Sequence, residues 1–185
     1  LAQRKTLVHE LGCIETLARV DTLCVDKTGT VTENKMIVED VCPLCDDRFT
    51  LDDIRMIMAD YVYAMQADND TMAALRRYFT GEKTQDATAT LPFSSAKKYG
   101  GVSFHAEETY LLGAPDVLLA GRENPYQEQI EGYSAKGCRV LLLGMYDGAL
   151  SDETLDAGLL PIALILLSNK IRAEAPETFG YFSAQ

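Results

Sequence analysis

The sequence predicts an α/β core that is interrupted by an inserted α+β domain, in which an antiparallel sheet is flanked by helices. Two short runs, residues 22–25 and 162–167, are almost entirely apolar, as is typical of strands covered on both faces in a parallel sheet. The residues between them combine helical patterns with β-rich ones, which indicates an α+β insertion. We therefore expect residues 1–35 and 161–185 to build part of one domain and residues 36–160 to build the other.

Each predicted helix has either apolar residues at helical spacing or a recognisable capping residue. Thr50 is a candidate N-cap, as are Asn69 and Asp70 for the helix that follows. Prolines can begin two further short helices, and Gly137 can end the second of these in the left-handed conformation. In chain order, the expected helices cover residues 5–18, 51–66, 70–79, 125–136 and 173–183, and a further short helix starts at residues 114–116.

The predicted strands lie mostly in the second half of the chain. They are short, apolar or alternating runs that are bounded by residues favouring turns. Two of them should form an antiparallel hairpin across residues 106–108. In chain order, the expected strands cover residues 22–25, 36–41, 87–93, 99–105, 109–112, 138–146 and 161–167.

Composition limits the function classes. The chain has 185 residues, 47% of them hydrophobic, and a net charge of -11. A charge of this sign argues against nucleic acid as a partner, because such binding needs a basic surface. Five cysteines, an odd number, with no signal peptide favour a reducing, cytosolic setting. No apolar run is long enough to cross a bilayer. The sequence at both ends suggests a piece of a longer protein.

The most specific motif is Asp26-Lys27-Thr28-Gly29-Thr30. It follows a predicted buried strand, and the ends of such strands are where α/β sheets bind ligands. Gly29 lets backbone approach a phosphate, Thr28 and Thr30 bring hydroxyl groups, and Lys27 brings positive charge. An Asp in this setting can accept a phosphoryl group, with Mg²⁺ offsetting the charge. The simpler interpretation, that Asp26 only begins a turn, fits the flanking sequence poorly.

Residues 17–21 and 26–36 resemble the P-type cation-transporting ATPases, within the haloacid dehalogenase-like superfamily. The resemblance implies a partial Rossmann-like phosphorylation domain, formed by residues 1–35 and 161–185. It also implies that residues 36–160 are a nucleotide-binding domain. These expectations agree with the core and the insertion predicted from the sequence patterns.

By this resemblance Asp26 is the phosphoacceptor, and Asp26 with the backbone carbonyl of Thr28 would bind Mg²⁺. Lys27 and Thr30 would contact the phosphoryl group. Soluble phosphatases of the superfamily place a second Asp two residues after the nucleophile as general acid and base, whereas this chain has Thr28 there. Without a carboxylate to activate water, a phosphoenzyme should hydrolyse slowly, as the cycle of a pump requires.

The resemblance continues into the insertion. Residues 91–98 are similar to the segment in which a Phe stacks on adenine and a Lys meets the phosphates, here Phe93 and Lys98. A later element is similar to the family's Lys-Gly-Ala-Pro-Glu, with Leu112 in place of the Lys, and Gly113 would let backbone approach adenine. Taken alone, Phe93 is as compatible with a core position as with a ligand.

Two arginines complete the implied nucleotide site. Arg139 matches the family's Gly-x-Arg segment, whose Arg contacts the nucleotide phosphates, although a surface Arg at the start of a strand is the ordinary alternative. Arg172 matches the Asp-x-x-Arg hinge at which the chain re-enters the phosphorylation domain, with Asn169 in place of the Asp. Cys42 and Cys45 have the spacing of metal ligands, but with no second pair they favour ordinary thiols.

The resemblance implies a part of a membrane protein that couples ATP hydrolysis to cation transport. Its partners would be ATP with Mg²⁺, and the membrane and actuator domains of the same parent chain, on the cytoplasmic side. The transported cation would bind outside these residues. Because the family's later Mg²⁺-binding elements are missing from this sequence, the isolated chain should only bind nucleotide. Two alternatives are a soluble phosphatase of the same superfamily and a non-catalytic nucleotide-binding module.

Overall fold

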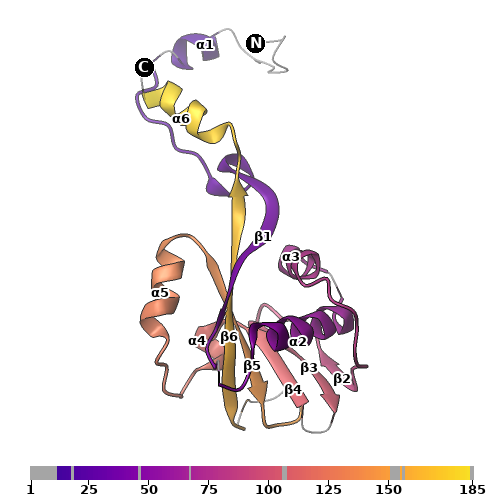
Figure 1. Cartoon of the computed structure of the whole chain (residues 1–185). Helices are drawn as coiled ribbons and strands as arrows, with labels where there is room; N and C mark the ends of the chain where they lie inside the picture. The colour runs from indigo at the N-terminus through magenta and orange to yellow at the C-terminus, as the bar shows by residue number, and fades with distance from the viewer. Residues whose placement is uncertain are drawn as a thin grey trace.

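A computed structural model describes residues 12–17, 19–45, 47–66, 68–105, 108–150, 155 and 157–183. These residues contain a six-stranded antiparallel sheet with the strand order β1-β6-β5-β4-β3-β2 (Figure 1). The strands are β1 (Thr32–Pro43), β2 (Ala89–Leu91), β3 (Tyr99–His105), β4 (Glu108–Gly113), β5 (Arg139–Tyr146) and β6 (Leu159–Ile171). All the predicted strands except the first therefore exist; the strand over residues 99–105 has the predicted ends, and the ends of the others are shifted.

The helices also agree with the sequence patterns. They are α1 (Gly12–Leu17), α2 (Leu51–Ala64), α3 (Asp70–Tyr78), α4 (Pro115–Leu118), α5 (Gln127–Ala135) and α6 (Ala175–Ser183). The predicted caps are formed: the Thr50 hydroxyl accepts a hydrogen bond from the Asp53 amide, and the Asn69 side chain accepts one from the Met72 amide. The helix predicted over residues 5–18 lies partly outside the described residues.

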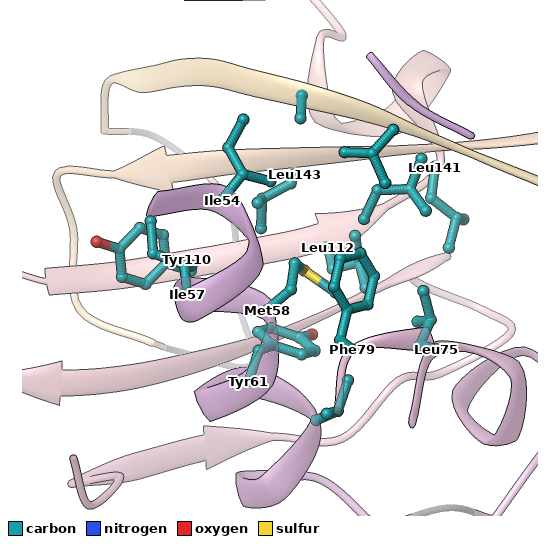
Figure 2. Close-up of a cluster of buried hydrophobic side chains, with 14 of the residues drawn as sticks. Ile54, Ile57, Met58, Tyr61, Leu75, Phe79, Tyr110, Leu112, Leu141 and Leu143 are labelled. Carbon is teal, nitrogen blue, oxygen red and sulfur yellow. The ribbon is translucent and has the colours of Figure 1, made fainter. Parts of the chain in front are cut away.

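Helices cover both faces of the sheet (Figure 1). Side chains alternate between the faces along each strand, so Leu112 and Leu143 meet α2 and α3, whereas Leu111 and Leu142 meet the side of α4 and α5. Figure 2 shows the first of these clusters, in which Met58 of α2 lies over the strand residues. The chain thus has two apolar layers, one on each side of a shared sheet.

The apolar run at 162–167 was correctly predicted to be buried on both faces, but the prediction of a parallel strand was wrong. β6 lies between β1 and β5 and pairs with both in the antiparallel direction. Leu164 and Leu166 belong to one apolar cluster, and Ile165 and Leu167 to the other. A central antiparallel strand that is covered by helices on both sides has the same continuous apolar sequence as a parallel one.

The strand predicted over residues 22–25 is not formed. Residues 20–26 have no regular secondary structure, and Val20, Leu23 and Val25 are 54%, 45% and 42% exposed. A buried strand needs a neighbour on each side, and no other strand of the described chain pairs with this segment. No parallel pair of strands occurs within the described ranges, so the Rossmann-like part stays a prediction.

The paired strands β1 and β6 extend beyond the rest of the sheet toward α1 and α6 (Figure 1). Pro43 pairs with Ala163 inside the body, and Thr32 pairs with Ile171 at the far end. The loop that contains Asp26 lies at this far end. β1 and β6 each continue across a predicted domain boundary, although the strand pairing is irregular near both, between Thr32 and Met36 in β1 and between Pro161 and Ala163 in β6. The division into two domains stays a prediction.

Candidate functional site

The loop after Asp26 forms a wide, π-type helical turn, η2 (Lys27–Val31). The buried hydroxyl of Thr32 stabilises it: the hydroxyl accepts from the Gly29 amide at 3.4 Å and donates to the Lys27 carbonyl at 3.2 Å. Gly29 has a positive φ of 78°. Asp26, Lys27 and Thr30 are exposed, whereas the side chain of Thr28 lies outside the described part of the structure.

Arg172 joins this loop to the end of β6. Its amide donates to the Val31 carbonyl at 3.0 Å, and its guanidinium donates to the carbonyls of Gly29 at 3.0 Å and Thr32 at 3.3 Å. The resemblance assigned Arg172 to the nucleotide. The structure places it against the backbone of the predicted phosphoacceptor loop, where it orders the carbonyl groups that follow Asp26.

An open pocket of about 300 Å³ lies beside this loop, on the side of the sheet's main body. It combines residues from the loop, from both long strands and from the turn between α5 and β5. Its lining includes Lys27, Arg139 and Asn169, which were singled out in the sequence. The full lining is Lys27, Thr32, Met36, Ser134, Gly137, Cys138, Arg139, Leu167, Ser168 and Asn169.

The local fold explains why Arg139 lines the pocket. α5 ends at Ala135 with Lys136 as its C-cap, and Gly137 reverses the chain with a φ of 85°, so that β5 begins at Arg139 beside β6. The exposed guanidinium donates through Nη1 to the hydroxyl of Thr71 at 2.9 Å. On the loop side, the Lys27 ammonium lies beside Gly137, because a Cβ built there would be 3.5 Å from its Nζ. Two cations from distant segments therefore border one pocket.

The residues predicted to hold adenine form a second group. Phe93 follows β2 and is 43% exposed, so its ring is available for stacking. Lys98 has a positive φ of 59°, and its ammonium lies 3.4 Å from the Asp116 carboxylate, both side chains being exposed. Such a pair contributes little to stability, so Lys98 can exchange this partner for an anionic ligand at low cost.

Gly113 has a structural reason to be glycine. A Cβ there would lie 2.4 Å from the Tyr99 Cβ and 2.6 Å from the Lys98 carbonyl oxygen. The Ala114 amide donates to the same oxygen at 2.9 Å, which fixes this element to Lys98. Leu112, which replaces the family's Lys, is 4% exposed and packs in the cluster beneath α2 and α3. The position is apolar in this chain because it faces the core.

The group around Lys27 and Arg139 and the group around Phe93 and Lys98 lie at the same end of the sheet. Among the described residues, they do not line a common pocket. Tyr99 begins β3 and pairs with Gly113 at the end of β4, and Gly113 pairs with Leu142, three residues after Arg139 in β5. Antiparallel pairing therefore gathers Lys98, Gly113 and Arg139 at the end of the sheet that faces the Asp26 loop. A ligand with a planar end and an anionic end could extend along this end of the sheet.

Sequence reasoning missed the side chains that shape the pocket without carrying charge. Met36 and Ser168 line the pocket, and Thr71 contacts two of its lining residues, Met36 and Arg139. These three residues belong to three different elements, and only the fold brings them together. The sequence does not indicate that Thr71 bonds Arg139, because the two residues are 68 positions apart.

Metal binding by Cys42 and Cys45 receives no support. The described residues contain no group of three or more His, Cys, Asp or Glu side chains suited to a metal. The Cys42 thiol instead lies 3.4 Å from the Tyr133 hydroxyl, and this hydrogen bond raises the pKa of Tyr133.

Among the described helices, none is long and apolar enough to cross a membrane.

Comparison with known proteins gives no matching family model, but it gives clear relatives. Calcium-transporting ATPase CtpE of Mycolicibacterium smegmatis is 39% identical over 189 residues, covering 100% of this chain and 23% of that protein. Probable cation-transporting ATPase exp7 of Streptococcus pneumoniae is 38% identical over 192 residues, with the same coverage. The chain thus spans 23% of the length of these curated relatives.

Solved structures share the fold. A zinc-transporting PIB-type ATPase matches 86% of this chain and 23% of its own, with a TM-score of 0.57 and 20% identity. The catalytic domain of the CPx-ATPase CopB-B matches 96% of this chain and 56% of its own, with a TM-score of 0.55 and 14% identity. At these identities the likeness concerns the fold alone.

Proposed function

This chain belongs to the family of P-type cation-transporting ATPases. We therefore propose that the end of its sheet that carries Lys98, Gly113 and Arg139 binds ATP, and that Asp26 accepts the γ-phosphoryl group. The antiparallel sheet with flanking helices matches the fold of a nucleotide-binding domain of this family. The observation that carries the proposal is the pocket at which Lys27 of the Asp26 loop and Arg139 of β5 converge.

In the proposed binding mode adenine stacks on Phe93 beside Gly113, and the phosphates extend past Lys98 toward Arg139. Three observations support it: the exposed ring of Phe93, the exposed ammonium of Lys98, and the position of Arg139 at the same sheet edge. An Arg guanidinium suits phosphate oxygens because it can offer two parallel donors. Lys98 and Arg139 supply local positive charge in a chain whose net charge is -11.

In the proposed reaction a carboxylate oxygen of Asp26 bonds to the γ-phosphorus as the bond from phosphorus to the oxygen of ADP breaks. The product is an aspartyl phosphate, and the leaving electron pair stays on ADP. Lys27 and Thr30 would contact the transferred group, while Arg172 holds the loop backbone through Gly29. Asp26 and the Thr28 carbonyl would hold Mg²⁺, which when bound offsets the charge between carboxylate and phosphate.

Thr28 distinguishes a pump from a phosphatase in this proposal. A second carboxylate at this position would activate water, but Thr28 carries none, so the aspartyl phosphate should persist. In the parent protein this would leave time for coupling to membrane and actuator domains, and thereby to cation transport from the cytoplasmic side. Residues 1–35 and 161–185 would belong to its Rossmann-like phosphorylation domain.

The proposal is tested by titrating the 185-residue chain with ATP. Because each variant removes a direct contact, we expect Phe93→Ala and Arg139→Ala each to weaken ATP binding by about tenfold, in line with about 1–3 kcal/mol for stacking or a charged hydrogen bond. AMP binding should respond to Phe93→Ala but hardly to Arg139→Ala. Calorimetry gives both affinities.

Tyr63→Ala is the matched control, since Tyr63 is an aromatic side chain, 55% exposed, on α2. It should leave ATP affinity unchanged. Equal affinities of the unmodified chain and both site variants would remove the assigned nucleotide site. Rapid steady-state ATP hydrolysis, or release of phosphate from a small phosphomonoester, would favour the soluble phosphatase instead.

A further inference from the structure

Thr71 has two hydrogen bonds that converge from different parts of the fold. Its hydroxyl donates to the Met36 sulfur at 3.4 Å and accepts from Arg139 Nη1 at 2.9 Å. A hydroxyl has one proton and two lone pairs. Because the proton is directed to the sulfur, a lone pair is free for the guanidinium, so the orientation of the hydroxyl suits Arg139.

Met36 is itself held by α3 at two points. Besides the contact of Thr71 with its sulfur, Arg77 Nη2 donates to the Met36 carbonyl at 2.7 Å. Met36 is 8% exposed and lines the pocket together with Arg139. The N-terminal end and the last turn of α3 therefore both contact β1, which gives the Thr71 hydroxyl a fixed place relative to the pocket.

From these contacts we infer that Thr71 is a positioning residue, which holds the Arg139 guanidinium toward the anionic end of a nucleotide. The inference rests on the proposed function and adds a residue to which the sequence analysis assigned no role. An exposed Arg side chain has many rotamers, and ordering it costs conformational entropy. Thr71 meets part of that cost before the ligand arrives, so the hydroxyl contributes to affinity without touching the ligand.

The expected effect depends on the phosphates. Thr71→Val keeps the shape of the side chain and removes the hydroxyl, so we expect it to weaken ATP binding about three- to tenfold, the usual effect of one hydrogen bond. AMP binding should not change, because AMP lacks the β- and γ-phosphates. Thr71→Ser, which keeps the hydroxyl, should restore ATP affinity. In an Arg139→Ala background, Thr71→Val should have no further effect.

The controls separate positioning from folding and from direct contact. Thr90→Val makes the same chemical change at an exposed position of β2 and should be neutral. The side-chain Nε–H signal of Arg139 should broaden or shift in Thr71→Val while the melting temperature stays close to that of the unmodified chain.

An unchanged ATP affinity in Thr71→Val would overturn the inference while leaving the proposed function intact. Equal losses for ATP and AMP would also overturn it, since they would indicate a contact with the nucleoside or a loss of structure. Additive losses in the double variant would contradict it as well, because Thr71 would then act independently of Arg139. If the unmodified chain binds neither nucleotide, the proposed function fails and the inference fails with it.

Discussion

Tyr61 is among the largest fully buried side chains, and it lies in the cluster between α2 and the sheet (Figure 2). Removing a phenol from water disfavours its charged form, so burial raises the pKa of Tyr61 above its ordinary value of 10.0. Stability and titration are linked wherever the folded and unfolded states bind different numbers of protons. Tyr61, which the candidate site does not use, therefore contributes to the loss of stability of this fold at alkaline pH.

We predict that the chain loses stability as the pH rises above about 10, the ordinary pKa of a tyrosine. Below that pH both states keep the proton of Tyr61. Above it the unfolded chain loses the proton first, so the folded state binds more protons and the free energy of unfolding falls with pH. Urea denaturation between pH 8 and 11, a range of about three units around that value, measures the slope.

Tyr61→Phe should flatten this slope, whereas Tyr63→Phe, at an exposed position of the same helix, should not. Identical slopes in the two variants would show that another group controls the alkaline transition.

The start of α2 is stabilised by its own residues. Thr50 and Asp53 form a capping box, in which each side chain binds the backbone amide of the other. Hydrogen bonds from Thr50 also lower the pKa of the Asp53 carboxyl. Local features of this kind can be predicted from sequence, because their partners are three residues apart.

Replacing Thr50 by Ala should reduce the free energy of unfolding by about 1 kcal/mol, because one amide at the helix start loses its acceptor. The pKa of Asp53 should rise toward its ordinary value in the same variant. Chemical denaturation measures the first effect, and NMR titration of the carboxyl measures the second. Thr50→Ser, which keeps the hydroxyl, should resemble the unmodified chain; a similar loss in both variants would exclude the capping hydroxyl as the cause.

Elements that depend on distant partners were harder to predict. The apolar sequence of residues 162–167 indicated burial on both faces, but strand direction is set by β1 and β5, which pattern alone does not place. Phe93, Gly113 and Arg139 carry recognisable motifs. The Arg139–Thr71 hydrogen bond has no such signal, because its geometry exists only after α3 has packed against β1.

Across the whole molecule, burial is uneven along the two longest strands. In β6, residues 162–167 are buried between the two apolar clusters, whereas Lys170 and Ile171 are exposed, the latter by 61%. Segments with few buried apolar contacts open more easily than the core. The far end of the β1–β6 pair should therefore be less stable than the body of the sheet.

Hydrogen exchange followed by NMR tests this expectation. Paired amides of β6 within residues 162–167 should show the highest protection factors in the strand, and those near Ile171 should show much lower ones. Substituting Arg172 by Ala should lower protection near the Asp26 loop further, because the carbonyls of Gly29 and Thr32 both lose the guanidinium as a donor. Uniform protection along β6 would contradict the prediction.

The same pair of strands has a mechanical consequence. The covalent path from the Asp26 loop to the body of the sheet runs along β1, whereas β6 reaches the loop through the hydrogen bonds of Arg172. The two strands are joined by backbone hydrogen bonds, by the Ser168–Glu39 contact and by the Lys170–Glu33 ion pair at 3.3 Å. If ATP binds as proposed, the bending and torsional stiffness of this strand pair would limit how closely a phosphate beside Arg139 can approach Asp26. Additional side-chain links between β1 and β6 would then change the rate of the proposed phosphoryl transfer, although they lie away from the Asp26 loop.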